Sequence, residues 1–139
     1  MVSDTNRVPK NTDLAYCAGI VDGEGSITIS MVSSGTYELR LDISNTDYGV
    51  LDYFQTTFGV GKVHFHSRPL RRVIYKYYAY GKKACFVLSL LLPYMRIKKT
   101  QAKLAIEFQN KLIGRKVSRK NRVLYHNKMK SLNHIWRLI

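Results

Sequence analysis

Two neighbouring stretches of alternating side chains constrain the fold of this chain more than any other feature. Residues 25–33 and 38–43 alternate between apolar and other side chains, and Ser34 and Gly35 form a turn between them. The apolar positions are Ile27, Ile29, Met31, Leu39, Leu41 and Ile43. The opposite positions are Ser26, Thr28, Ser30, Val32, Ser34, Glu38, Arg40 and Asp42. Because side chains of a strand point alternately to its two faces, the pattern predicts a β-hairpin with one buried and one open face.

Helical patterns surround this hairpin and a second one. A helix capped by Thr12 is predicted to end at the glycines before residue 26, and a second helix begins at residues 46–47 and ends at Gly59. Strands follow over residues 61–68 and 73–80, and helices over residues 83–92 and 97–112. After Gly114 we expect a last amphipathic helix whose apolar side carries Leu124, Leu132 and Trp136.

This order, αββαββα with further C-terminal helices, predicts an α+β fold: a four-stranded antiparallel sheet with helices on one face. A doubly wound parallel fold has a similar rhythm, but strands joined twice by short turns favour hairpins. The 139 residues fit a single domain, with a core over residues 12–112 and a basic helical extension over residues 115–139. The outward side of the strands is polar, so one face of the sheet is free to bind a partner.

The charge of the chain indicates what this partner is. Lys and Arg number 23 against 9 Asp and Glu, which gives a formal net charge of +14. Nucleic acid is the usual partner of such a chain, because bound phosphates release condensed counterions. We expect no membrane partner, since no apolar run approaches the roughly 20 residues of a spanning helix. The polar N-terminus and two cysteines in apolar stretches predict an intracellular protein, in the cytoplasm of a prokaryote or in an organelle.

A motif joins the first helix to the first strand. Residues 14–25 read LAYCAGIVDGEG, and they resemble the signature of the LAGLIDADG homing endonucleases, with Ala18, Gly19 and the acidic end matching directly. Gly23 is an ordinary variant of the alanine there, and Glu24 replaces the more usual second aspartate. Residues 43–47, 58–61 and 93–99 resemble later blocks of the family in the same order. The resemblance covers about residues 12–112.

The resemblance implies a homodimer, because family members with two motifs are pseudo-dimers and this chain has a single motif. Ala18 and Gly19 would let two copies of the first helix approach closely across a two-fold axis. Asp22 would cap the helix of the partner. The alternative for the two small residues is a helix packed tightly inside its own subunit.

The resemblance also implies an active site that uses a divalent metal. Glu24 and the carbonyl of Gly23 would hold Mg²⁺, which typically takes one or two carboxylates together with phosphate oxygens and water. Lys98 matches a basic residue near the scissile phosphate, and its alternative is a solvated lysine at a helix start. Asn45 matches a position that orients solvent near the metal, and its alternative is a residue at a helix entry.

Double-stranded DNA would lie on the outward face of the sheet, because a two-stranded ribbon fits the major groove. On the third strand, Val63 and Phe65 would face the core, and the outward residues are His64, His66 and Arg68. A base or phosphate contact is favoured for the two histidines over a metal pair, since no third ligand lies near them in the sequence.

The fourth strand and the tail supply further candidate contacts. Two phases are open for the fourth strand: charge places Arg72 and Lys76 outward, whereas the family register places Tyr75 and Tyr77 there. In the tail, which has no acidic residue after Glu107, we expect sequence-independent phosphate contacts. The residues expected to make them are Arg119, Lys120 and Arg122.

The resemblance therefore implies a site-specific endodeoxyribonuclease. It would make a double-strand break in a long pseudo-palindromic target by metal-dependent phosphodiester hydrolysis, and so promote intron mobility. Two alternatives use the same fold: an RNA-splicing maturase that binds intron RNA, and a DNA-binding regulator without catalytic acids. Glu24 and Lys98 count against the regulator. Basic and aromatic residues suit RNA as well as DNA, so the maturase stays open.

Overall fold

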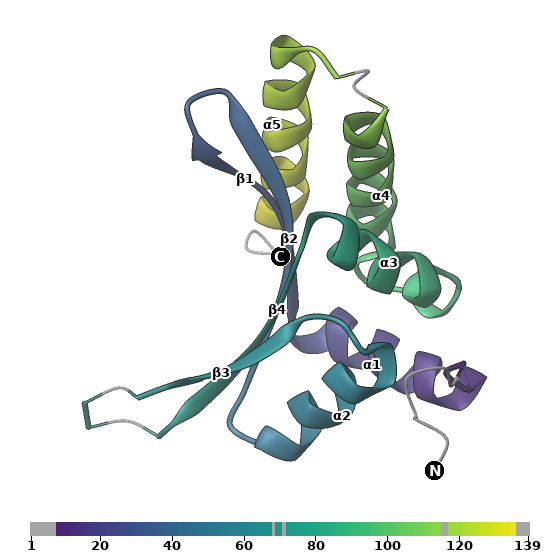
Figure 1. The fold of residues 1–139 in the computed structure, drawn as a ribbon, viewed down its shortest axis with the longest axis vertical. Coiled ribbons are helices and arrows are strands. Elements are labelled where there is room, and N and C mark those ends of the chain that lie inside the picture. Colours follow the sequence, from purple (N-terminus) through teal and green to yellow (C-terminus); the bar gives the residue numbers. More distant parts are fainter. Residues whose placement is uncertain (1–7, 68, 71, 115–116, 136–139) are drawn as a thin grey trace.

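The computed structural model describes residues 8–67, 69–70, 72–114 and 117–135 of the chain. The elements are α1 (Asn11–Glu24), β1 (Gly25–Ser33), β2 (Thr36–Asn45), α2 (Tyr48–Phe58), β3 (Lys62–His66), β4 (Ile74–Tyr80), α3 (Gly81–Leu91), the 3₁₀ turn η2 (Leu92–Tyr94), α4 (Lys99–Ile113) and α5 (Arg119–Ile135) (Figure 1). The predicted order αββαββα with C-terminal helices is confirmed. The cap of α1 is Lys10 rather than Thr12, which lies inside the helix.

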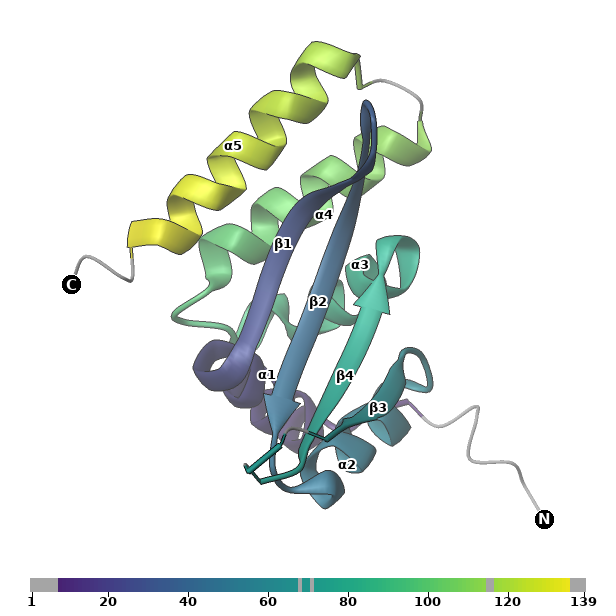
Figure 2. The same cartoon turned by 90° about the vertical axis from the view of Figure 1, so that its left-hand side faces the viewer.

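The four strands form one antiparallel sheet in the order β1-β2-β4-β3. The hairpins β1–β2 and β3–β4 join through their second strands, so β1 and β3 are the two edges. Helices α1 to α4 lie on one face of this sheet and leave the other face open (Figures 1 and 2). The predicted α+β fold is therefore confirmed. Within the described ranges, none of the helices has the length and apolar composition that crossing a bilayer requires.

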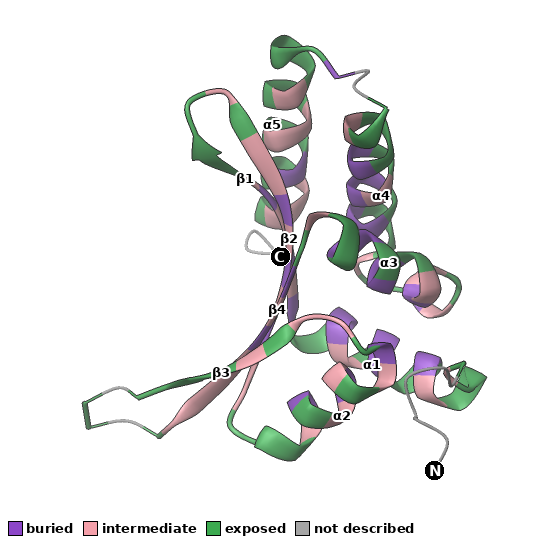
Figure 3. Ribbon diagram, viewed as in Figure 1, coloured by how far each residue is buried: buried purple, intermediate pink, exposed green. Residues whose placement is uncertain are grey.

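The core lies between the sheet and these four helices (Figure 3). The inward residues of β1 and β2 are at most 2% exposed, as the alternation predicts, and they are Ile27, Ile29, Leu39, Leu41 and Ile43. Burial of each such side chain contributes about 1.5–3 kcal/mol. A slip of one residue would turn all five towards solvent, so the core fixes the register of the first hairpin.

Tyr77 fixes the phase of β4. Its side chain is fully buried, and its hydroxyl donates a hydrogen bond to the carbonyl of Val60 at 2.8 Å. Gly61 has a φ of +87°, and a Cβ at that position would collide with the Tyr77 ring. Glycine is therefore needed there both for its backbone conformation and for the space it leaves. The inward set of β4 consists of Tyr75, Tyr77 and Ala79.

The outer ends of both hairpins extend beyond the helices (Figure 3). Two apolar residues that the alternation assigns to the core lie there, and the structure corrects both predictions. Met31 is 59% exposed and Phe65 is 62% exposed. The alternation gives the face on which each residue lies, but no helix covers that face at the ends of the hairpins.

Helix α5 runs alongside the edge strand β1 (Figure 2). Its Met129 is buried and Leu132 packs against the core, whereas Leu124 is 55% exposed, contrary to the prediction. The predicted Trp136 lies outside the described residues. Asn133 Nδ2 donates to the carbonyl of Ile27 at 2.9 Å, and His126 Nδ1 donates to that of Ile29 at 2.5 Å. Side chains of α5 thus satisfy carbonyls on the free edge of the sheet.

Candidate active site and nucleic-acid interface

The junction of α1 with β1 places Glu24 at the edge of the open face. The helix ends at Glu24 and the strand begins at Gly25 without a loop. A Cβ on Gly25 would lie 2.8 Å from the carbonyl oxygen of Val21, so a side chain at this position would force the helix and strand apart. Glu24 is exposed, whereas Gly25 beside it is buried.

Asn45, at the end of β2, holds the Glu24 carboxylate. Its Nδ2 donates to Glu24 Oε2 at 2.8 Å, and its Oδ1 accepts from the backbone N of Asp47 at 2.8 Å. The second bond fixes which end of the amide faces Glu24. Among the described residues, none bonds the other carboxylate oxygen, Oε1. The predicted proximity of Glu24 and Asn45 is therefore present, and both alternatives for Asn45 apply, since it also lies at the entry to α2.

Lys98 reaches the same corner from the segment before α4. Its Nζ donates to the carbonyl of Val21 at 3.2 Å and to that of Gly25. These contacts place a positive charge at the C-terminal end of α1, where the helix dipole is negative. Burial lowers the pKa of Lys98, and the charge of Asp22 opposes this shift. Lys98 is thus a fixed and half-buried cation rather than a solvated one.

Asp22 holds the segment that carries Lys98. Its side chain is buried, Oδ2 accepts from the backbone N of Arg96 at 2.8 Å, and Oδ1 accepts from that of Lys98 at 3.0 Å. We expected Asp22 to cap the helix of a partner at a dimer interface. The structure corrects this expectation, because both oxygens are used within the chain.

The two small residues of the motif lie on different sides of α1. Ala18 is fully buried in the core of its own chain, so the prediction that it lies at a dimer interface is wrong. Gly19 is exposed, and a Cβ there would meet nothing within 4 Å. Its place at a dimer interface stays a prediction. Tyr16 and Gly23 are exposed along the same helix.

The outward face of the first hairpin carries the predicted polar residues. Ser26, Thr28 and Ser30 are half-buried on β1, and the register places Ser26 opposite Asp42 and Thr28 opposite Arg40. Glu38 lies opposite Ser30. Beyond the bulge at the end of β1, Val32 and Ser34 are exposed near the turn. Their roles in DNA binding stay predictions.

On β4 the charge-based phase is correct. Lys76 lies opposite Ser44 of β2 and His64 of β3, and residues paired in this way share one face. Tyr77 is buried and Tyr75 packs on the inward side against Tyr48, so the expectation that these two tyrosines face DNA is wrong.

Tyr78 and Tyr80 occupy the outward face in their place, and the sequence reasoning missed them. Their rings stack at 6.1 Å with an angle of 8° between their planes. The guanidinium of Arg40 lies 4.8 Å from the Tyr78 ring centre, and Arg40 Nε pairs with Asp42 at 3.2 Å. The Tyr78 hydroxyl is 3.1 Å from His66 Nε2. Extending the alternation from Lys76 would have identified both tyrosines.

The remaining candidates lie at the outer ends of the hairpins and on α5. His64, His66 and Arg72 are exposed, and Arg68 lies outside the described residues. Arg119 Nη2 donates to Ser34 Oγ at 3.4 Å, Arg122 Nη1 donates to the Gly35 carbonyl at 3.2 Å, and Lys120 is exposed. Two of the three tail cations are thus held against the β1–β2 turn.

Known proteins are similar to this chain over most of its length. A statistical model of the LAGLIDADG endonuclease family matches residues 17–106. The homing endonuclease I-CvuI, solved in complex with its target in the presence of 2 mM Ca, is 26% identical, with a TM-score of 0.75 over 87% of this chain and 82% of that chain.

Two further solved structures support the fold alone. The archaeal intron-encoded homing endonuclease I-Vdi141I, complexed with DNA, is 18% identical, with a TM-score of 0.65 over 93% of this chain and 99% of that chain. The LAGLIDADG homing endonuclease I-GzeII, in complex with its DNA target, is 19% identical, with a TM-score of 0.63 over 86% of this chain and 43% of that chain.

Proposed function

The chain belongs to the LAGLIDADG endonuclease family, and from this premise we propose that it cuts both strands of a long pseudo-palindromic target as a homodimer that uses a divalent cation. Its class is that of a DNA endonuclease acting at specific sites. The proposal concerns the cation, the number of subunits and the form of the target.

One observation carries the proposal: Glu24, Asn45 and Lys98 meet where α1 ends and β1 begins. Glu24 supplies an exposed carboxylate, and Lys98 supplies a cation bonded to the carbonyl of the next residue, Gly25. Ser26, the first outward residue of β1, follows directly. A DNA backbone at this corner would therefore lie beside the face that carries the candidate base contacts.

The donors at this corner fit a divalent metal. Glu24 offers a hard oxygen ligand in Oε1, and the backbone of Gly23 beside it is exposed. Within the described part of the chain, no three His, Cys, Asp or Glu side chains gather as a metal site. A cation such as Mg²⁺ would then complete its ligands with phosphate oxygens and water. When bound, it would activate a water molecule and stabilise charge on the phosphate.

The residues of the chain have separate tasks in this proposal. Asn45 orients Glu24 through its Nδ2 and leaves Oε1 for the cation. Lys98 places positive charge where the scissile phosphate gains negative charge. Asp22 keeps Lys98 in place by binding the backbone on both sides of Ile97, so it acts as a positioning residue.

A homodimer is supported by the exposed side of α1. Gly19 and Gly23 lie four residues apart on this helix, and neither has an atom within 4 Å of the place where a Cβ would be. A second helix could approach closely along such a surface. A second copy would also bring a second Glu24, so that each strand of the duplex would meet one carboxylate.

Intron mobility and RNA are finer parts of the proposal. We assign the double-strand break to intron mobility, a role that agrees with the intron-encoded origin of I-Vdi141I. Intron RNA is a second candidate partner, favoured by the stacked Tyr78 and Tyr80 with Arg40 beside them, because unpaired bases stack on aromatic rings and guanidinium groups. Splicing of the intron RNA with and without the protein tests this candidate.

Substitution of Glu24 tests the proposed chemistry. A target is first selected by cleavage from a library of randomised duplexes in Mg²⁺. Glu24→Gln keeps the shape of the side chain but removes its charge, so we expect cleavage of the selected target to fall at least 10²-fold, on the order of the loss of one catalytic group. Binding measured in Ca²⁺ should stay within about threefold of that of the unmodified protein.

A matched control is Glu107→Gln, which makes the same change in an exposed glutamate on α4 that pairs with Lys111. This variant should cleave normally. Cleavage by Glu24→Gln at the rate of the unmodified protein would place the catalytic acid elsewhere, whereas a monomer in sedimentation on DNA would contradict the homodimer.

A further inference from the structure

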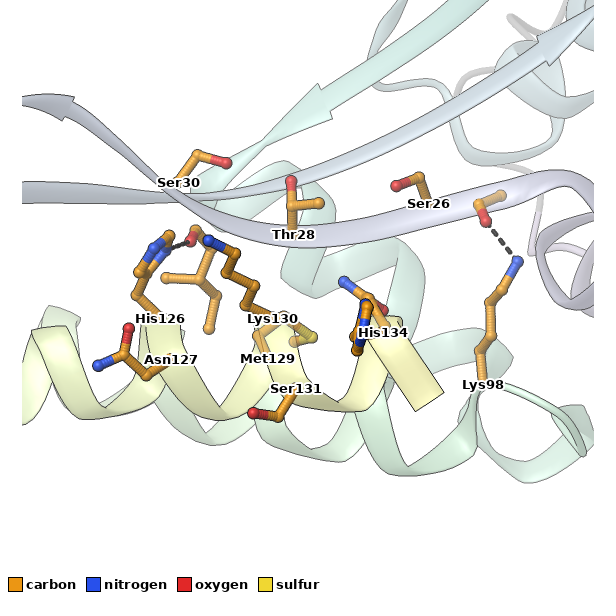
Figure 4. A pocket seen from close by; sticks show the side chains of 13 residues that line it. Ser26, Thr28, Ser30, Lys98, His126, Asn127, Met129, Lys130, Ser131 and His134 are labelled. Atoms are coloured by element: carbon orange, nitrogen blue, oxygen red, sulfur yellow. Dashed lines mark hydrogen bonds between the residues drawn. The ribbon is translucent and has the colours of Figure 1, made fainter. Parts of the chain in front are cut away.

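A groove separates the outward side of β1 from α5 (Figure 4). Its volume is about 930 Å³. One wall consists of β1 with the hydroxyls of Ser26, Thr28 and Ser30, and the other consists of the C-terminal half of α5. The charged, polar or titratable side chains of the second wall are His126, Asn127, Lys130, Ser131, Asn133 and His134.

The lining of the groove favours an anion. Two ammonium groups, Lys98 and Lys130, line it, and no acidic side chain does so among the described residues. Lys130 is exposed and makes no hydrogen bond or ion pair with any residue in the described ranges. The β1 hydroxyls opposite can donate hydrogen bonds to phosphate oxygens. Cations on one wall and hydroxyls on the other suit a chain of phosphates.

The walls are held at a fixed separation. His126 and Asn133 bond the carbonyls of Ile29 and Ile27, so these two side chains tie α5 to β1. Lys130 lies between them in the sequence, one helical turn from His126. The structure thus uses two polar residues of α5 as ties and leaves Lys130 available to a ligand.

The groove is continuous with the active site. Lys98 lines it at the end where Figure 4 shows its Nζ bonded to the carbonyl of Gly25, next to Glu24. A DNA strand with one phosphate at Glu24 would therefore have neighbouring phosphates at the mouth of the groove. This continuity selects a DNA backbone over a small anion, which would need no extended path.

We propose that the groove binds the sugar-phosphate backbone of the target strand beside the scissile phosphate, with Lys130 in contact with a phosphate. The inference rests on the proposed function. It moves the phosphate contact of α5 from Arg119 and Arg122, which are held by the β1–β2 turn, to the C-terminal half of the helix.

A pair of lysines on opposite sides of α5 tests the inference. Lys130 lines the groove, whereas Lys128 lines a separate crevice between α4 and α5 together with Glu107. We compare Lys130→Gln and Lys128→Gln, which change the net charge equally. The dependence of duplex binding on salt concentration is measured in Ca²⁺ for both variants and the unmodified protein.

For Lys130→Gln, the slope of log affinity against log salt should fall by about 0.9 for each phosphate that the variant no longer neutralises. Lys128→Gln should keep the slope of the unmodified protein. A target with single neutral methylphosphonates beside the cut should show one position that weakens the unmodified protein but not Lys130→Gln. These results would support the groove as a backbone site.

Equal slopes for the two lysine variants would overturn the inference, as would methylphosphonate sensitivity confined to positions that both variants share. Neither result touches the proposed function, which depends on cleavage by the unmodified protein. Conversely, failure of the unmodified protein to cleave any selected duplex would contradict the proposed function, while the salt slopes would still report on the groove.

Discussion

Along the edge strand β1, side chains from outside the sheet bond every second carbonyl, namely those of Gly25, Ile27 and Ile29. The donors are Lys98, Asn133 and His126. The edge strand β3 has no such cover: four of its five residues are exposed, and these are Lys62, His64, Phe65 and His66. The first edge is closed by a helix, and the second is open to solvent on both faces.

This difference separates the two tasks of a site-specific nuclease. Chemistry needs groups held in one geometry, and the covered edge begins beside Glu24 and Lys98. Contacts with bases tolerate adjustment, and local opening costs least where few buried contacts hold a segment. The comparison predicts that substitutions at the β1 side change stability and cleavage, whereas substitutions on β3 change binding alone.

The largest effect should follow from Asp22→Ala at the anchored side. Two backbone donors, Arg96 N and Lys98 N, would lose their acceptors, at about 1–3 kcal/mol for each buried group left unsatisfied. Cleavage should fall as well, because Lys98 would lose its support. Urea unfolding and single-turnover cleavage measure both effects. Asp52→Ala on the exposed side of α2 is the control, and equal losses in the two variants would count against the anchoring role.

A smaller effect should appear at alkaline pH through Cys17, which lies under the anchored side. Burial is the main cause that raises the pKa of its thiol from 9.0 to about 12. The folded chain therefore keeps this proton where the unfolded chain has lost it. The resulting stability is fully present below pH 9 and is lost as the pH rises towards 12, by about 1.4 kcal/mol for each pH unit.

The window between pH 9 and 10 isolates this thiol, because tyrosines such as Tyr53 titrate from an ordinary pKa of 10.0. Urea unfolding of Cys17→Ala should show a flatter dependence on pH than the unmodified protein. The same slope in both proteins would show that Cys17 does not titrate differently in the two states.

A loss of about 1 kcal/mol should follow from Asn133→Ala, which removes one tie between α5 and β1 and leaves the Ile27 carbonyl without its side-chain donor. Asn127→Ala, at an exposed position of the same helix, should leave the unfolding free energy unchanged. If the two variants unfolded at the same urea concentration, the covered edge would contribute nothing to stability and the comparison would fail.

The smallest effect on stability should come from His64→Ala on the open edge. We expect an unchanged thermal midpoint and an unchanged cleavage rate on the preferred target, with a relaxed base preference at the contacted position. Selection of targets from the randomised library measures the preference. A fall in stability as large as that of Asn133→Ala would show that the open edge is as constrained as the covered one.

The sequence was sufficient for the order of elements and for the residues around Glu24. Glycine at the helix exit and the alternation that follows it determine where Glu24 lies, and the motif associates it with Asn45 and Lys98. The alternation also assigned the inward residues of β1 and β2 correctly. Local periodicity carries these features, because each depends on residues close together in the chain.

Features that depend on distant packing were beyond the sequence. Tyr75, Tyr77, Tyr78 and Tyr80 are chemically alike, so only the space beside Gly61 selects Tyr77 for the core. Phe65 is apolar and belongs to the inward side, yet nothing in the sequence marks the point where the helices end. Asp22 could cap a neighbouring segment or a partner, and its true acceptor role depends on where residues 96–98 return.

The pleat of the sheet has a consequence for changing the target of this enzyme. The hydroxyls of Ser26, Thr28 and Ser30 bond no other side chain in the described ranges, so replacements there should act additively, and a library could vary them one at a time. Arg40 is different, because it contacts Asp42, Tyr78 and Tyr80 together. Its neighbours would have to be varied with it, so half of the reading surface can be rewritten letter by letter and the other half only as whole words.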